Sequence, residues 1–127
     1  MTSPTQEFKP VFARLKSILQ KYERTPLKAD PDEPGYYALT GPASEITRGR
    51  DLWLGAVRLG KNYVSYHLMP VYGFPELLDD ISPALKKRMQ GKSCFNFKTI
   101  DESLFAELAA LTERGVQRFR TAGFLGK

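Results

Sequence analysis

The chain has a single cysteine, Cys94, and a single histidine, His67, and these two side chains are its first candidates for chemistry. A thiol beside an imidazole can act as a nucleophile, because the ring removes the thiol proton. No helix start or cationic neighbour is specified that would lower the pKa of this thiol, and isolated cysteines usually pack as small apolar residues. An enzyme that uses Cys94 and His67 is therefore an alternative hypothesis and not the leading one.

A second group of polar side chains is better suited to binding. Arg58, Tyr63 and His67 would share one face of a predicted hairpin, where three donors can orient a carboxylate or a phosphate. Lys61 from the turn and Cys94 from a later strand complete this candidate ligand site. The apolar side chains predicted on the same face, which would form its wall, are Leu52, Leu54 and Met69. The alternative is that a helix covers this face.

Aromatic side chains are frequent around this hairpin, and such residues can stack nucleic-acid bases. Packing explains them more simply, because aromatic residues favour strands and dominate buried area. The net charge is +5, with the basic residues spread along the chain. The densest basic group consists of Lys86, Lys87, Arg88 and Lys92. These residues are predicted to lie on the solvated face of a short helix and in the segment just past it. A nucleic-acid partner is therefore not expected.

Three acidic residues form the one candidate metal site. Asp30, Asp32 and Glu33 lie close together in a segment rich in proline and glycine, and their oxygens could ligate a hard cation. The segment lacks the glycine and the distal glutamate of a calcium loop. The alternative is a solvated acidic turn.

Several classes of protein are excluded by what the sequence lacks. It contains no Gly-rich phosphate loop and no GxSxG motif, and one cysteine with one histidine cannot build a zinc site from several such ligands. The 127 residues are predicted to form one domain spanning residues 1–127. The sequence has a lone thiol and no recognisable export signal, which indicates a cytoplasmic protein. It has no apolar run of membrane-spanning length, so no membrane partner is expected.

The segment that organises the fold is LWLGAVRLGKNYVSYHLMPVY, residues 52–72, which predicts a β-hairpin with its turn near Gly60. If the turn keeps even positions opposite odd ones, two faces follow. The predicted core face consists of Trp53, Gly55, Val57, Val64, Tyr66 and Leu68. The predicted mixed face consists of Leu52, Leu54, Ala56, Arg58, Tyr63, Ser65, His67 and Met69.

The remaining elements predict an α+β fold, a small antiparallel sheet with flanking helices. Amphipathic spacing indicates helices over residues 8–22 and from about residue 101 to Gly123, with Thr99 or Asp101 as the N-cap. Residues 36–40 are predicted to be an edge strand, and the exposed residues 36–39 would make a homodimer possible. Further predictions are helical turns at residues 75–80, a helix at residues 83–89 opened by Ser82 and Pro83, and a strand at residues 92–97.

The segments GKNYVSYHLMPVY and SPALKKRMQGKSCFNF, followed by an acidic helix start at Asp101 and Glu102, resemble the YdhG-like domain-of-unknown-function family. In that family a lysine-bearing hairpin strand with aromatic ends precedes a short helix, a GK-S-x-x-F strand and a closing helix. The resemblance is strongest over residues 52–118 and implies an α/β sandwich. Some members are described as frataxin-like iron chaperones, which implies weak iron binding through surface carboxylates.

The leading hypothesis from the sequence is a small domain that binds an anionic ligand or a protein partner without catalysis. Its candidate binding residues are Arg58, Lys61, Tyr63, His67 and Cys94. The alternatives are a frataxin-like iron-binding protein, with iron as the possible cofactor, and an enzyme that uses the thiol and the imidazole.

Overall fold

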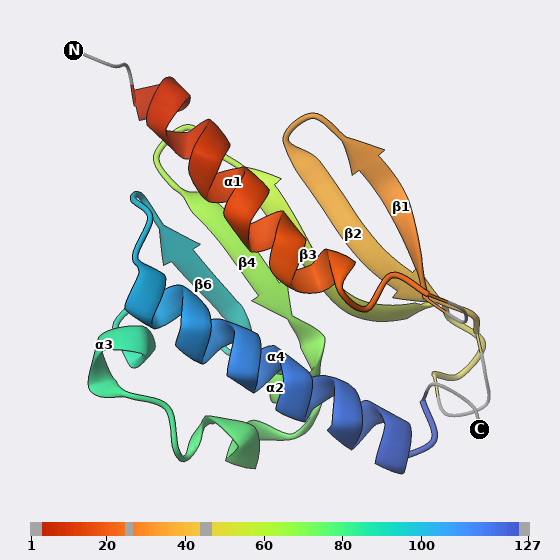
Figure 1. Ribbon diagram of the computed structural model, residues 1–127. Coiled ribbons are helices and arrows are strands. Elements are labelled where there is room, and N and C mark those ends of the chain that lie inside the picture. The colour runs from red at the N-terminus through yellow and green to blue at the C-terminus, as the bar shows by residue number, and fades with distance from the viewer. Residues whose placement is uncertain (1–3, 25–26, 44–46, 125–127) are drawn as a thin grey trace.

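The computed structural model describes residues 4–24, 27–43 and 47–124 of the chain, with side chains from Phe8 onward (Figure 1). The long helices are α1 (Pro4–Gln20) and α4 (Glu102–Thr121). The strands are β1 (Lys28–Glu33), β2 (Tyr36–Gly41), β3 (Leu52–Leu59), β4 (Val64–Leu68), β5 (Met89–Gln90) and β6 (Cys94–Phe97). Between β4 and β5 the chain forms α2 (Met69–Gly73), the 3-10 helix η1 (Pro75–Leu78) and α3 (Pro83–Lys86).

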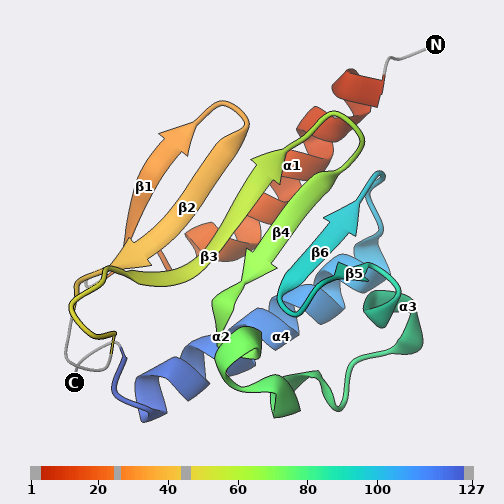
Figure 2. The same cartoon turned by 180° about the vertical axis from the view of Figure 1, so that it is seen from behind.

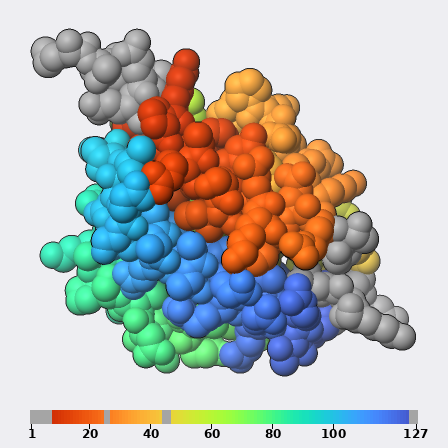
Figure 3. All heavy atoms as spheres, viewed as in Figure 1, coloured from red at the N-terminus to blue at the C-terminus, as the bar shows by residue number. Residues whose placement is uncertain are grey.

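The strands form one antiparallel, six-stranded sheet in the order β1-β2-β3-β4-β6-β5. Helices α1 and α4 lie side by side across one face, as the space-filling view shows (Figure 3). Neither long helix covers the opposite face, which we call the outer face (Figure 2). The α+β class predicted from the order of elements is therefore confirmed. Among the described helices, none combines the length and the apolar character needed to cross a lipid bilayer.

The core lies between the sheet and the two long helices. Leu15 and Leu19 of α1 and Leu108 of α4 are fully buried against the inner side of the strands. The rings of Phe97 on β6 and Phe105 on α4 meet edge to face, with 5.1 Å between their centroids. Amphipathic periodicity predicted these buried stripes because a helix that covers a sheet must be apolar along one side.

The helix ends differ in part from the prediction. Helix α1 begins at Pro4 and not near Phe8, so Pro10 lies inside the helix and not in its first turn. Proline is tolerated at the first helical position, and Pro4 takes that place here. At the start of α4, the cap is Asp101 and not Thr99, because the Leu104 amide donates to Asp101 Oδ1 over 3.0 Å.

The prediction that residues 36–40 form an edge strand is wrong, because β1 pairs outside β2. The main-chain groups of residues 36–39 are therefore covered on that side, and the exposed edge that suggested a homodimer does not exist there. No strand was predicted at β1, because it lies in the segment rich in proline and glycine; its sequence, KADPDE, also has low β propensity. Proline and charged residues are common in edge strands, where they hinder pairing with another chain.

The hairpin of β3 and β4 has the predicted parity. Val57 opposes Tyr66, and Arg58 opposes Ser65. The turn is closed by a bond of 3.0 Å from the Gly60 amide to the carbonyl of Tyr63. Because four residues separate the paired strands, even positions still oppose odd ones, and the predicted faces hold for the half of β3 nearest the turn.

A β-bulge reverses the faces in the other half of β3. Thr40 of β2 opposes Trp53 and not Leu54, so Leu54 is an extra residue in β3. Leu52 and Leu54 are consequently buried in the core, while Trp53 lies on the outer face and is 40% exposed. The predictions of a core position for Trp53 and of outer positions for Leu52 and Leu54 are wrong, because they assumed a regular strand.

The helix predicted over residues 83–89 is shorter than expected. Ser82 caps it as predicted, accepting a bond from the Leu85 amide over 3.1 Å, but α3 ends at Lys86. The next residues turn back to the sheet, where Met89 opposes Phe95 in the short edge strand β5. Tertiary pairing with β6 therefore overrides the local helical preference.

Candidate functional site

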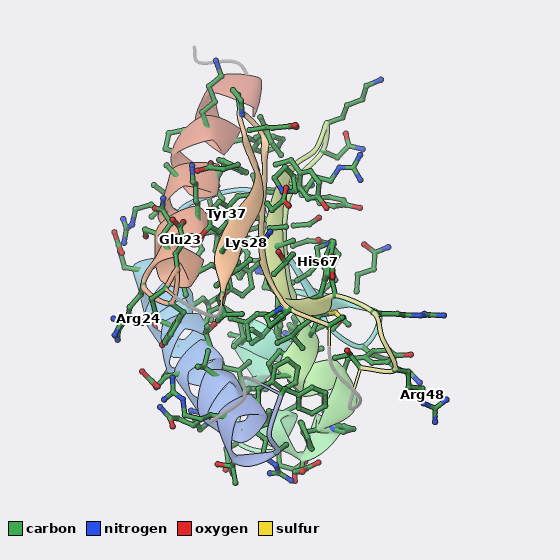
Figure 4. All side chains as sticks on the ribbon, turned by 90° about the vertical axis from the view of Figure 1, so that its right-hand side faces the viewer. Glu23, Arg24, Lys28, Tyr37, Arg48 and His67 are labelled. Atoms are coloured by element: carbon green, nitrogen blue, oxygen red, sulfur yellow. The ribbon has the colours of Figure 1, made fainter. Side chains whose placement is uncertain are left out.

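The outer face brings together polar side chains from three neighbouring strands. His67 of β4 opposes Cys94 of β6, and one row further along, Arg58 of β3 opposes Ser65 of β4. Arg58, His67 and Cys94 therefore share this face, as the parity argument predicted. Figure 4 shows the sheet from the side, with His67 pointing away from the helices and Arg24 on the side of the helices.

An open hollow of about 500 Å³ lies where the hairpin turns. We call it the hairpin hollow, and its lining residues are Arg58, Leu59, Gly60, Lys61, Asn62, Tyr63, Ser65 and His67. The hollow contains every member of the predicted ligand site except Cys94. The predicted apolar wall is absent from it, because the bulge buries Leu52 and Leu54, and Met69 packs against the core.

Hydrogen bonds between uncharged side chains form a network on the outer face next to this hollow. The Asn96 side-chain oxygen accepts from the Ser65 hydroxyl over 3.0 Å and from the Cys94 thiol over 3.4 Å. The Asn96 amide nitrogen donates to Gln90 Oε1 over 2.8 Å, and the Tyr63 hydroxyl approaches the same oxygen at 3.4 Å. These bonds hold polar side chains of β4, β5 and β6 in fixed positions without adding a negative charge to the outer face.

The charge of the hairpin hollow comes from Arg58 and Lys61. The pKa of His67 is lowered because the ring is half-buried and, to a smaller extent, because the Arg58 guanidinium is near. His67 is thus neutral at pH 7 and serves as a hydrogen-bonding group. Arg58 stacks over the ring of Tyr36, with 5.9 Å between Cζ and the ring centroid, which keeps the guanidinium over the outer face.

The thiol and the imidazole do contact each other. Cys94 Sγ lies 3.9 Å from His67 Nε2, which is a long contact for a hydrogen bond to sulfur. Burial raises the pKa of the Cys94 thiol, and a hydrogen bond with Ser65 opposes this change only in part. At neutral pH the pair is therefore a thiol beside a neutral ring, the opposite of an activated nucleophile.

This arrangement predicts slow alkylation of Cys94 at neutral pH. Because its pKa is raised, the folded protein has less thiolate at pH 7 than an ordinary cysteine, whose pKa is about 8.5. The rate with iodoacetamide should therefore be lower in the folded protein than in urea, and should rise only at alkaline pH. Mass spectrometry over time gives both rates. Faster alkylation of the folded chain would favour the enzyme that uses Cys94 and His67.

The three acids of the predicted metal site are not assembled. They lie on an extended strand and not on a turn, and Asp32 and Glu33 point to opposite faces because side chains alternate along a strand. Asp32 accepts a bond of 2.7 Å from the Lys16 ammonium on the helix side. Among the described residues, no three side chains of histidine, cysteine, aspartate or glutamate lie together as a metal site.

A second hollow, of about 330 Å³, was not predicted from the sequence. We call it the basic hollow, and its lining residues are Tyr63, Lys87, Arg88, Met89, Gln90, Asn96 and Lys98. The prediction assigned Lys87 and Arg88 to the solvated face of a helix, whereas they follow α3 and line this hollow. The local sequence carries no signal that brings Lys98 near them, because β5 had not been predicted.

Comparison with known proteins shows no match to this chain. No family model matches it, and no curated protein or solved structure matches it at a significant level. The resemblance to the YdhG-like family therefore stays a prediction. The structure itself defines the class as an α+β domain with one sheet face covered by the two long helices and one sheet face that neither long helix covers.

Proposed function

We propose that this protein binds a small anionic molecule in the hairpin hollow and performs no bond chemistry there. The observation that supports this proposal is the lining of the hollow, which combines Arg58 and Lys61 with no acidic side chain among the described residues. Asn62, Tyr63 and Ser65 add neutral donors. A volume of about 500 Å³ is within the range of small-molecule sites.

The chemistry of this lining suits carboxylates and phosphates. A guanidinium can bind two oxygens of one anion, and an ammonium adds a point charge from the turn. His67 is neutral at pH 7, so it can donate one hydrogen bond to an anion and can also become charged when the anion favours protonation. The raised pKa of the neighbouring Cys94 thiol supports binding without covalent chemistry.

Membership of the YdhG-like family, with its α/β sandwich, is compatible with this proposal, and the iron-chaperone alternative makes a separate prediction. Iron delivery of that kind requires hard oxygen ligands close together. The proposed binding test therefore includes ferrous and ferric iron beside anions, and stabilisation by iron alone would favour the chaperone over the anion-binding protein.

The test compares anion binding by the natural chain with binding by Arg58→Gln/His67→Gln. Thermal unfolding with phosphate, citrate and a nucleoside monophosphate identifies a ligand, because a ligand at a hundred times its Kd adds about 2.7 kcal/mol of stability. Calorimetry then gives the Kd. We expect the double variant to bind at least about tenfold more weakly, since even one hydrogen bond to a charged group contributes about 1.5–3 kcal/mol and a factor of ten in Kd corresponds to about 1.4 kcal/mol.

The matched control is Arg24→Gln, which removes one positive charge from the helix side of the molecule (Figure 4). It should leave the Kd of the anion unchanged within about twofold, because distant surface charges are screened at physiological salt. Full affinity in Arg58→Gln/His67→Gln, or an equal loss in Arg24→Gln, would contradict the proposed site.

A further inference from the structure

The hairpin hollow and the basic hollow are neighbours that share one aromatic side chain. Tyr63 lines both of them. Its hydroxyl approaches Gln90 of β5, and the Asn96 amide donates to the same Gln90 oxygen. The two hollows thus form one strip, which runs from the turn after β3 across Tyr63 to the segment that follows α3.

The cations of this strip have no acidic partner among the described residues. On the helix side, Arg14 pairs with Glu102, and Lys16 pairs with Asp32. The cations of the strip are Arg58, Lys61, Lys87, Arg88 and Lys98. None of them forms an ion pair with a described acidic residue. Neither hollow is lined by a described acidic residue, so the strip carries unpaired positive charge that attracts polyanions.

The aromatic ring between the two basic groups narrows the class of ligand. A polymer that carries a negative charge on every unit can contact both hollows at once. If its units also carry planar aromatic bases, one base can stack on the ring of Tyr63. A base-paired duplex hides the faces of its bases inside the helix, so only an unpaired strand can use the ring. An acidic peptide carries negative charges but has no bases that could stack on the ring.

From these features we infer that the strip binds single-stranded nucleic acid, with phosphates at the two basic groups and a base on Tyr63. This inference rests on the proposed anion site, which would hold one phosphate, and extends it across Tyr63 to a chain. It differs from the expectation drawn from the sequence, which placed Lys87 and Arg88 on a solvated helix and did not associate Lys98 with them.

The experiment measures binding of a fluorescent ten-nucleotide oligo-dT by anisotropy at several salt concentrations. The variant Lys87→Gln/Arg88→Gln/Lys98→Gln should weaken binding by about tenfold at low salt. It should also reduce the slope of log K against log salt by about 2, since each phosphate contact to a single strand contributes about 0.7. Binding of thymidine monophosphate should stay within about twofold of the natural chain, because the hairpin hollow is intact.

Two controls separate the strip from net charge and from folding. Lys9→Gln/Arg24→Gln/Arg114→Gln removes the same charge from exposed positions outside the strip, and it should bind the oligonucleotide within about twofold of the natural chain. Tyr63→Leu should bind the oligonucleotide about fivefold or more weakly than Tyr63→Phe, because both variants lack the hydroxyl and only Tyr63→Phe keeps the stacking ring.

The outcomes distinguish this inference from the proposed function. Tight oligonucleotide binding that falls in the strip variants alone supports the inference. Binding of the mononucleotide with no gain for the oligonucleotide overturns the inference and leaves the anion site standing. Absence of both overturns both. Equal affinity for a duplex or for polyglutamate overturns the assignment to single strands, as does an equal loss in the two triple variants.

Discussion

Replacement of Gly55 by alanine is expected to destabilise the fold by about 3 kcal/mol, the upper part of the range for overpacking. A Cβ atom at this position would lie 2.6 Å from the carbonyl oxygen of His67 and 3.1 Å from Leu19 Cδ2. The oxygen belongs to the backbone, so β3 and β4 would have to separate. Thermal unfolding should show a fall in Tm of roughly 10 °C for a domain of this size.

The matched control is Gly73→Ala, the same substitution at the exposed end of α2. A Cβ atom there meets nothing within 4 Å. Its effect should be near zero or slightly stabilising, because alanine has less freedom to lose on folding. An unchanged Tm in Gly55→Ala would show that the two strands do not approach each other as closely as described.

Thr112→Val is expected to cost about 1–3 kcal/mol, although valine has nearly the same shape as threonine. The Thr112 hydroxyl donates to the Leu108 carbonyl over 2.8 Å, so Tyr66 must be the donor in the 2.6 Å bond between the two hydroxyls. Both side chains are fully buried. Valine would leave the Tyr66 hydroxyl without an acceptor, and denaturant unfolding measures the loss.

A double variant tests that explanation. Tyr66→Phe/Thr112→Val removes the donor together with the acceptor, so it should be more stable than Thr112→Val alone. Thr121→Val, the same change at an exposed position of α4, should be within about 0.5 kcal/mol of the natural chain. If the double variant is the less stable one, the loss comes from packing and not from the orphaned hydroxyl.

The sequence predicted the fold where local patterns agree with the packing. Periodicities of two and 3.6 residues predicted the alternation of β4 and β6, the apolar stripes of α1 and α4, and the face that Arg58 shares with Ser65. The caps at Ser82 and Asp101 follow from side-chain chemistry that acts within three residues.

The features that were missed depend on contacts between distant segments. Strand β1 has a sequence with low β propensity, and only the main-chain groups of β2 make it a strand. The extra residue Leu54 follows from register with β2 and reverses the faces of Leu52 and Trp53. No alternation pattern within β3 distinguishes a bulge from a regular strand.

The candidate site was predicted in part for the same reason. Arg58 and His67 lie on neighbouring strands of one hairpin, whose parity the sequence specifies, and Lys61 and Tyr63 lie in its turn. The basic hollow needs Lys98 beside Arg88, which requires β5 to fold back on β6. A two-residue strand is too short for any periodic signal.

The bulge in β3 also has an optical consequence. It places Trp53, the only tryptophan of the chain, on the outer face and not in the core. The indole is thus already partly in water in the folded state, so its emission reports less on the melting of the interior than a buried tryptophan would. Any molecule that covers this half of the sheet would change the polarity around the indole and so its emission. The fluorescence of Trp53 therefore reports on binding at the face on which we place the function.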